Sequence, residues 1–139
     1  MVILLLLWRA EGYHQSAVGH LSPFIHECRT YYLNSRFSFK QARIIKLIGD
    51  AEGVAIYGSG GLARLMYQIF RQNNITVLNF IEQSEKPPVH INGIDISVKA
   101  LRDCLQQKIV VAAQPVRLEM VGQLTNLGLN EWRDFMVVA

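Results

Sequence analysis

The sequence has few cysteines, few charged residues and only short hydrophobic runs. Its two cysteines, Cys28 and Cys104, cannot form a disulfide framework, a four-thiolate zinc site or an iron–sulfur ligand set. Charged residues make up 18% of the 139 residues and hydrophobic residues 50%, which excludes wholesale disorder and provides a packed core for one domain. These features are typical of a protein in a reducing compartment, and we expect a cytoplasmic location.

Membrane, nucleic-acid and metal-binding patterns are also lacking. The apolar run Met1–Trp8 is far shorter than the roughly 20 residues of a spanning helix, so we expect no membrane span and expect the run to pack on the domain. Contact with a partner or a membrane surface is the alternative.

The net charge of +3 comes from residues 1–50, which hold six basic and three acidic residues without a basic run. We therefore expect a solvated helix face and no nucleic-acid partner. The four histidines lack zinc-ligand spacing, so no metal is expected.

The N-terminal third has a helical pattern. Ser22-Pro23 is typical of a helix start, and Asn34-Ser35 predicts a break. Ser38 and Gln41 form a capping-box pair that would begin a second helix, which Gly49 would end. We therefore expect two short helices joined by a turn. Their aromatic residues are expected to pack on the following domain, or else to form an exposed patch for a partner chain: Tyr31, Tyr32, Phe37 and Phe39.

Strand and helix patterns alternate after this region. Strands are predicted from apolar, β-branched segments at residues 54–57, 75–81, 108–113 and 135–138. Helices are predicted at residues 62–70, 97–105 and 115–127, the last beginning at Pro115 and ending before Gly128. A loop is predicted at 85–88 and a small hairpin at 89–96. The alternation implies a mostly parallel sheet with helices on both faces, so we predict an α/β, Rossmann-like domain over residues 51–139 after a helical extension over residues 1–50.

One glycine-rich turn carries specific chemistry. The segment Gly58-Ser59-Gly60-Gly61-Leu62-Ala63 lies between a predicted strand and helix and matches the G-x-G-x-x-A fingerprint of dinucleotide-binding domains. Gly58 would allow the tight turn, Gly60 the close approach of a phosphate, and Ala63 the close packing of the helix on the strand. The N–H groups and the dipole of the helix would then bind the phosphate. The alternative is that the glycines only form a tight turn.

Four further side chains complete the predicted site. Glu82 follows a predicted strand about 20 positions after the glycines, where a carboxylate would accept hydrogen bonds from ribose hydroxyls and repel the 2′-phosphate of NADP. Arg64 and Arg117 lie near predicted helix starts, where either could bind a phosphate through two parallel hydrogen bonds. Ser59 could donate its hydroxyl to a phosphate. The alternatives are a solvated strand end for Glu82 and ordinary surface charges for the arginines.

The segment Val54–Arg64 (VAIYGSGGLAR), followed by Asn79–Glu82 (NFIE), resembles the N-terminal domain of bacterial sugar acyltransferases of the sialic acid O-acetyltransferase and bacillosamine N-acetyltransferase type. Val89–Leu101 and Lys108–Ala113 are similar to later parts of that domain, so the resemblance covers about residues 51–138. It implies a Rossmann-like domain that binds a nucleotide sugar, with the glycines against the diphosphate and Glu82 near the ribose or the base.

The chain departs from that family in several places. Leu62 stands where many members have histidine, Glu82-Gln83 replaces a paired acidic sequence, and the short loop between Ala113 and Arg117 lacks glycine. The hexapeptide repeats that carry the acetyl-CoA site and the catalytic histidine in the family are absent from this sequence. We therefore expect no acyl transfer by this chain and assign no catalytic residue.

These patterns lead to one preferred function and two alternatives. We predict a stand-alone nucleotide-binding domain, accessory or regulatory in polysaccharide biosynthesis, with a UDP-sugar-like ligand. The alternatives are an NAD-binding oxidoreductase or sensor, and a degenerate domain that assembles with a partner enzyme or a second copy through residues 1–50. The predicted ligand-binding residues are Gly58, Ser59, Gly60, Gly61, Leu62, Ala63, Arg64, Glu82 and Arg117.

Overall fold

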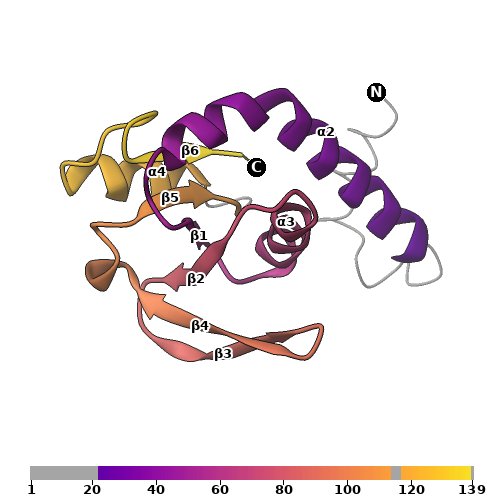
Figure 1. Cartoon of the computed structure of the whole chain (residues 1–139). Helices are drawn as coiled ribbons and strands as arrows, with labels where there is room; N and C mark the ends of the chain where they lie inside the picture. The colour runs from indigo at the N-terminus through magenta and orange to yellow at the C-terminus, as the bar shows by residue number, and fades with distance from the viewer. Residues whose placement is uncertain (1–21, 114–116, 139) are drawn as a thin grey trace.

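The computed structural model describes residues 22–113 and 117–138, and a six-stranded, mostly parallel sheet forms its centre (Figure 1). The strand order is β3-β4-β2-β1-β5-β6, and only the β3–β4 pair is antiparallel. The strands are β1 (Val54–Tyr57), β2 (Val77–Glu82), β3 (Lys86–Ile91), β4 (Ile94–Ala100), β5 (Lys108–Val111) and β6 (Phe135–Val137). The predicted α/β class is confirmed, and the arrangement is consistent with a Rossmann-like fold.

The register of the parallel strands brings the ends of β1, β2, β4, β5 and β6 to one edge of the sheet. Tyr57, the last residue of β1, is paired with Ile81 of β2 and with Val111 of β5, and Val111 is paired with Val137 of β6. We call this edge, marked by Tyr57, Glu82, Val111 and Val137, the carboxyl edge. In open α/β sheets this is where ligands bind.

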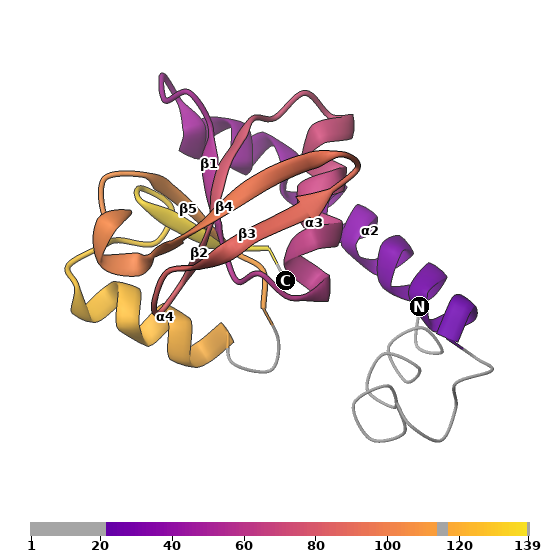
Figure 2. The same ribbon diagram turned by 90° about the horizontal axis from the view of Figure 1, so that it is seen from below.

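Helices cover both faces of the sheet (Figure 2). The helices α2 (Ser22–Ile48) and α3 (Gly61–Gln72) lie on one face, and α4 (Arg117–Asn126) and the 3₁₀ turn η2 (Leu101–Asp103) lie on the other. Side chains alternate along each strand, so Ile56 joins the core under α3 while its neighbour Tyr57 joins the core under α4. The last side chain of β1 therefore points to the α4 side of the sheet.

The predicted break in the N-terminal helix is wrong, because α2 is one continuous helix of 27 residues. At the expected break, the side-chain amide of Asn34 donates a hydrogen bond to the carbonyl of Thr30 at 3.0 Å, which keeps this polar side chain within the helix. Leu33 and Phe37 on either side of Asn34 are buried in the core, and this packing outweighs the local preference for a turn. The predicted helix end is confirmed, since Gly49 has a φ of +53°.

The region around the hairpin differs from the prediction in two places. Ser97, predicted to cap a helix, lies within β4, where the alternating burial of Ile96, Val98 and Ala100 is that of a strand. The predicted loop at 85–88 overlaps β3, which tolerates its two prolines because it is an edge strand. The hairpin turn itself is confirmed, with positive φ angles at Asn92 and Gly93.

The remaining predicted strands and the helices α3 and α4 are confirmed, apart from shifts of a few residues at their ends. The predictions for Met1–Trp8 and for a helix start at Pro115 lie outside the described residues. Within residues 22–113 and 117–138, no helix combines the length and the apolar character that crossing a membrane requires.

Candidate functional site

The turn from β1 into α3, Gly58–Gly61, lies at the carboxyl edge, and we call it the glycine loop. Gly58 has a φ of +117°, and a Cβ atom there would lie 3.0 Å from the carbonyl oxygen of Ala112 and 3.2 Å from the Cβ of Ala113. Its N–H donates to the carbonyl of Ile81 at 2.9 Å. Both the backbone angle and the close approach of the segment after β5 require glycine, as the sequence predicted for the tight turn.

At Gly60, neither the backbone angle nor a close contact requires glycine. It is the N-cap of α3, has a φ of −79°, and a Cβ atom there would meet no atom within 4 Å among the described residues. The first helical bond runs from Arg64 N to Gly60 O at 3.0 Å, which leaves the N–H groups of Gly61, Leu62 and Ala63 without an acceptor inside the helix. Open space at Gly60 and donors at the start of a helix are the geometry of an anion site.

Leu62 and Ala63 contribute to such a site through the backbone alone. Their side chains are buried in the core between α3 and the sheet. Ala63 is fully buried, in line with the small residue that close packing of a helix on a strand needs. A histidine side chain in place of Leu62 would have to leave this core to reach a ligand.

Ser59 and Glu82 are brought together by the fold. The hydroxyl of Ser59, in the glycine loop, donates a hydrogen bond to Oε1 of Glu82, at the end of β2, at 2.6 Å. Both residues are half-buried. Arg64 is exposed on α3 and donates from Nε to the carbonyl oxygen of Ser59 at 3.0 Å. Three residues predicted separately from the sequence thus form one connected group at the carboxyl edge.

A buried tyrosine next to this group was missed in the sequence. The hydroxyl of Tyr57 donates to Oε1 of Gln123 on α4 at 2.6 Å and accepts a hydrogen bond from Nε2 of Gln83, which also bonds to Gln123 at 2.5 Å. Burial raises the pKa of Tyr57 above its ordinary value of 10.0, and the nearby carboxylate of Glu82 acts in the same direction. Tyr57 therefore stays neutral at neutral pH. Its hydroxyl is a buried polar group held in place by Gln83 and Gln123. The place of Tyr57 immediately before the glycines was the available signal.

Basic residues of α2 also reach the carboxyl edge, which the sequence did not predict. Lys40 donates from Nζ to the carbonyl oxygen of Val137, the last residue of β6, at 2.6 Å. Burial lowers the pKa of Lys40, and the charge of Arg36 adds to this effect. Glu131 acts in the opposite direction, and Arg43 and Arg117 have smaller lowering effects. The predicted site residue Arg117 is thus one of the charges that lower the pKa of Lys40. The expected solvated helix face is only partly solvated, because Arg36 and Lys40 are half-buried.

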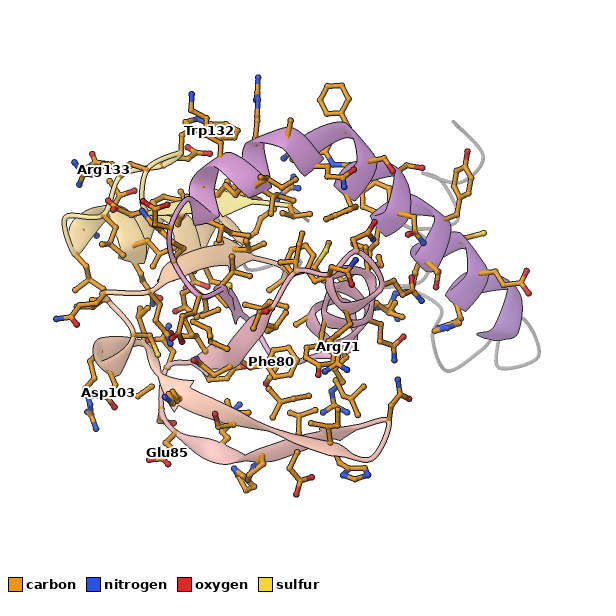
Figure 3. The ribbon with its side chains drawn as sticks, in the orientation of Figure 1. Arg71, Phe80, Glu85, Asp103, Trp132 and Arg133 are labelled. Atoms are coloured by element: carbon orange, nitrogen blue, oxygen red, sulfur yellow. The ribbon has the colours of Figure 1, made fainter. Side chains whose placement is uncertain are left out.

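Two hollows in the described part of the chain lie away from the glycine loop. One, of about 320 Å³, lies between α3 and the hairpin and includes Tyr67 and Arg71, whose labelled side chain appears above the hairpin in Figure 3. The other, of about 360 Å³, is lined by Arg43, Lys46 and Trp132. The guanidinium of Arg43 lies 4.9 Å from the ring centre of Trp132.

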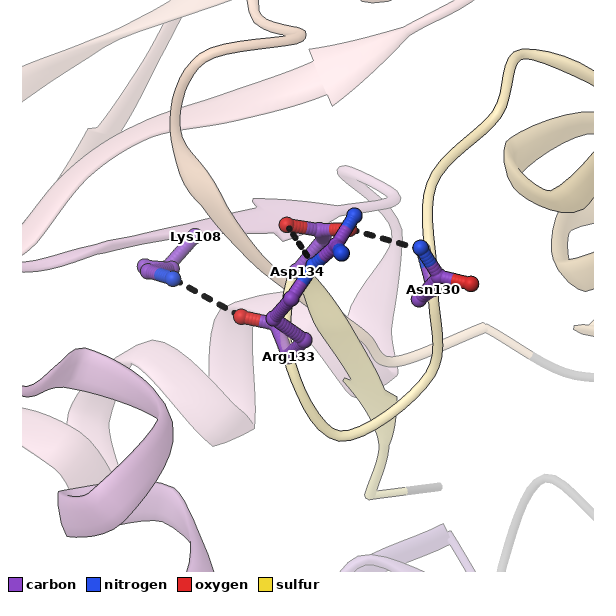
Figure 4. Close-up of polar contacts among 4 residues, drawn as sticks. All are labelled: Lys108, Asn130, Arg133 and Asp134. Atoms are coloured by element: carbon purple, nitrogen blue, oxygen red, sulfur yellow. Dashed lines mark hydrogen bonds and ion pairs between the residues drawn. The ribbon is translucent and has the colours of Figure 1, made fainter.

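The turn that carries Trp132 has an unusual backbone. Trp132 has a φ of +74°, and its N–H donates to the carbonyl of Phe135 at 2.7 Å. The carboxylate of Asp134 holds the turn by accepting from the N–H of Asn130 at 2.8 Å and from the guanidinium of Arg133 at 2.9 Å (Figure 4). These bonds, that of Arg133 foremost, keep the pKa of Asp134 below its ordinary value.

No group of three or more His, Cys, Asp or Glu side chains in residues 22–113 and 117–138 could hold a metal ion.

Comparisons with models of protein families, with curated proteins and with solved structures find no match to this chain.

Proposed function

We propose that the chain is a Rossmann-like module that binds a nucleotide, preferably a nucleotide sugar, across the carboxyl edge. The observation that carries the proposal is the hydrogen bond of 2.6 Å between Ser59 and Glu82, because it puts a carboxylate against a glycine loop with open space at Gly60. The N–H groups at the start of α3 would bind the phosphates, and Glu82 would bind the ribose.

The hydrogen-bonding capacity of Glu82 supports this assignment. One of its oxygens accepts from Ser59, and among the described residues its Oε2 atom has no hydrogen-bond partner. A ribose hydroxyl is a donor that would use it, while a 2′-phosphate would be repelled by the same charge. Arg64, exposed beside Ser59, could turn its guanidinium toward a phosphate.

An accessory or regulatory role in polysaccharide biosynthesis is part of the proposal and rests on the resemblance of Val54–Arg64 and Asn79–Glu82 to the nucleotide-sugar-binding domains of bacterial sugar acyltransferases. NAD is the second candidate ligand, because a carboxylate at the end of β2 suits the adenosine ribose of a dinucleotide equally well. The two ligands differ beyond the first ribose and can be separated by direct binding.

The test is a thermal-shift screen of the full chain with UDP, UDP-N-acetylglucosamine, CMP, NAD, NADP and coenzyme A. A ligand at 100 times its Kd stabilises the native state by about 2.7 kcal/mol, a shift of several degrees for a domain of this size. We expect a shift with UDP and the UDP-sugar. A shift with NAD alone would replace the nucleotide sugar by the dinucleotide, and no shift with any compound would refute nucleotide binding.

Two glycine variants make the screen specific for the glycine loop. Gly60→Val should abolish the shift, because its side chain would occupy the space that a phosphate needs, while the circular dichroism spectrum stays unchanged. Gly122→Val is the matched control, since Gly122 of α4 is likewise free of atoms within 4 Å of a Cβ position but lies outside the loop. A shift that survives Gly60→Val would remove the phosphate-binding role of the loop.

An assembly function is favoured by a different observation. Three large apolar side chains of α2 are exposed, namely Tyr31 (56%), Phe39 (81%) and Ile45 (56%), whereas Phe37 is buried in the core. Exposed apolar side chains along one helix can form an interface with a partner enzyme or a second copy. Light scattering of the full chain and of Phe39→Ser tests this: a dimer that the substitution dissociates supports assembly, and a monomer in both cases refutes self-assembly.

A further inference from the structure

We propose that Arg36 and Lys40 of α2, together with Arg117 at the start of α4, form a second anion subsite that binds a phosphate group at the carboxyl edge. The assignment of this phosphate to a nucleotide rests on the proposed function, but the observations that carry the subsite are independent of the glycine loop. The subsite would give the N-terminal helix a direct part in binding.

Arg36 carries a buried donor that no described residue uses. Its Nε atom is buried and has no hydrogen-bond partner within residues 22–113 and 117–138. Buried polar atoms almost always have a partner, so an exception calls for an explanation such as a ligand. The planar guanidinium of arginine is suited to bind two phosphate oxygens at once.

The cations around Lys40 repel one another. Arg36 and Lys40 are four residues apart on α2 and are therefore neighbours on the helix surface. After burial, the charges of Arg36, Arg43 and Arg117 lower the pKa of Lys40, and that of Glu131 raises it. In the described part of the chain, no carboxylate forms an ion pair with Arg36, Lys40 or Arg117. A bound anion would neutralise this group and remove the repulsion, and the N-terminal N–H groups of α4 would add to the positive potential.

The position of these cations matches an extended ligand bound at the glycine loop. Lys40 is held at the end of β6 by its bond to Val137, and β6 is separated from β1 by one strand. Nearer its start, α2 places the guanidinium of Arg29 3.4 Å from the Cβ position of Gly61. The same helix therefore runs from the glycine loop to the proposed subsite (Figure 1). The helix would therefore form a second side of the site.

The experiment titrates the full chain with inorganic phosphate, pyrophosphate and UDP at constant ionic strength and follows the melting temperature. Arg36→Met and Lys40→Met should each weaken the response to pyrophosphate by about tenfold, equivalent to about 1.4 kcal/mol. Lys86→Met on the edge strand β3 removes one positive charge far from the subsite and should leave the response unchanged. Lys40→Arg, which keeps the charge, should retain binding.

The melting temperature without ligand separates binding from support of the fold. Because Arg36→Met removes a buried donor without a partner and a like charge, the free protein should melt no lower than the wild type. A lower melting temperature with an unchanged response to phosphate would overturn the proposal, and so would the absence of any phosphate response in the wild type.

The glycine-loop variant distinguishes the two proposals. Gly60→Val should abolish the additional effect of UDP over phosphate and leave the phosphate response of the subsite. A response to phosphate that depends on Arg36, without any response to UDP, would support the subsite and refute nucleotide binding. A response to UDP that depends on Gly60 but not on Arg36 or Lys40 would refute the subsite alone.

Discussion

The hydroxyl of Tyr57 donates a hydrogen bond to the side-chain oxygen of Gln123 at 2.6 Å, which joins the last residue of β1 to α4. The two residues are 66 positions apart in the sequence. The bond lies beside Glu82, whose carboxylate contributes to the raised pKa of Tyr57. The bond therefore connects α4 to the part of the sheet that carries Glu82, the carboxylate on which the proposed nucleotide site depends.

We expect Tyr57→Phe to lower the free energy of unfolding by about 1 kcal/mol, the usual net contribution of one hydrogen bond. The loss should stay small because Gln83 and Gln123 remain bonded to each other, so neither amide loses its only partner. Urea denaturation measures the change. Tyr31→Phe is the matched control, since Tyr31 is 56% exposed and its substitution should change stability little. Equal effects of the two substitutions would contradict the role given to the buried hydroxyl.

The two glycines of the loop should differ in their effect on stability. Gly58→Ala should destabilise the fold by about 1–3 kcal/mol, because alanine would adopt a positive φ and press on the carbonyl of Ala112. Gly60→Ala should change the free energy of unfolding by less than about 0.5 kcal/mol, since its Cβ atom meets open space. Thermal denaturation of both variants checks this difference. Equal losses would mean that the loop is packed at Gly60, and the space assigned to a phosphate would not exist.

The parts of the site that could be predicted from the sequence are those that depend on short-range spacing. The glycine loop and Glu82 can be predicted as candidate site residues because the fingerprint sets their positions relative to one strand and the helix after it. Ser59 was predicted to bind phosphate, yet its bond to Glu82 follows from the pairing of β1 with β2, which periodicity alone does not fix. The α/β class could be predicted because alternating strands and helices leave few topologies.

The parts that were missed depend on tertiary packing. The half-buried state of Arg36 and Lys40 results from where α2 crosses the sheet, and no local pattern in residues 1–50 encodes that position. The continuous α2 was mispredicted for the same reason: Asn34 favours a break locally, but Leu33 and Phe37 bury their side chains in the core. Tyr57 and Gln123 likewise meet only after β1 and α4 have packed together.

Lys40 should make stability depend on pH in a defined direction. Its pKa in the folded protein lies below its ordinary value of 10.5, so the unfolded chain binds more protons than the native state between the two values. Stability should therefore rise with pH in the alkaline range and level off near about pH 10.5. The free energy of unfolding of wild type relative to Lys40→Met, measured at steps between about pH 8 and about pH 10.5, should increase. A constant difference would mean that Lys40 is not desolvated.

The Trp132→Gly variant should be more stable to unfolding than the Trp132→Ala variant, contrary to the usual order of glycine and alanine. Its φ of +74° is unfavourable for any residue with a Cβ atom, and the turn is held there by the bond from Trp132 N to Phe135 O and by the contacts of Asp134. Both substitutions remove the contact of the ring with Arg43, so their difference isolates the backbone. We expect Trp132→Gly to exceed Trp132→Ala by about 1 kcal/mol in the free energy of unfolding, because relief of the positive φ outweighs the greater chain entropy of glycine. Chemical denaturation of the pair measures this difference directly. If alanine were the more stable, the turn would not hold residue 132 in the left-handed region, and the hollow beside Arg43 and Lys46 would owe its shape to the indole ring alone.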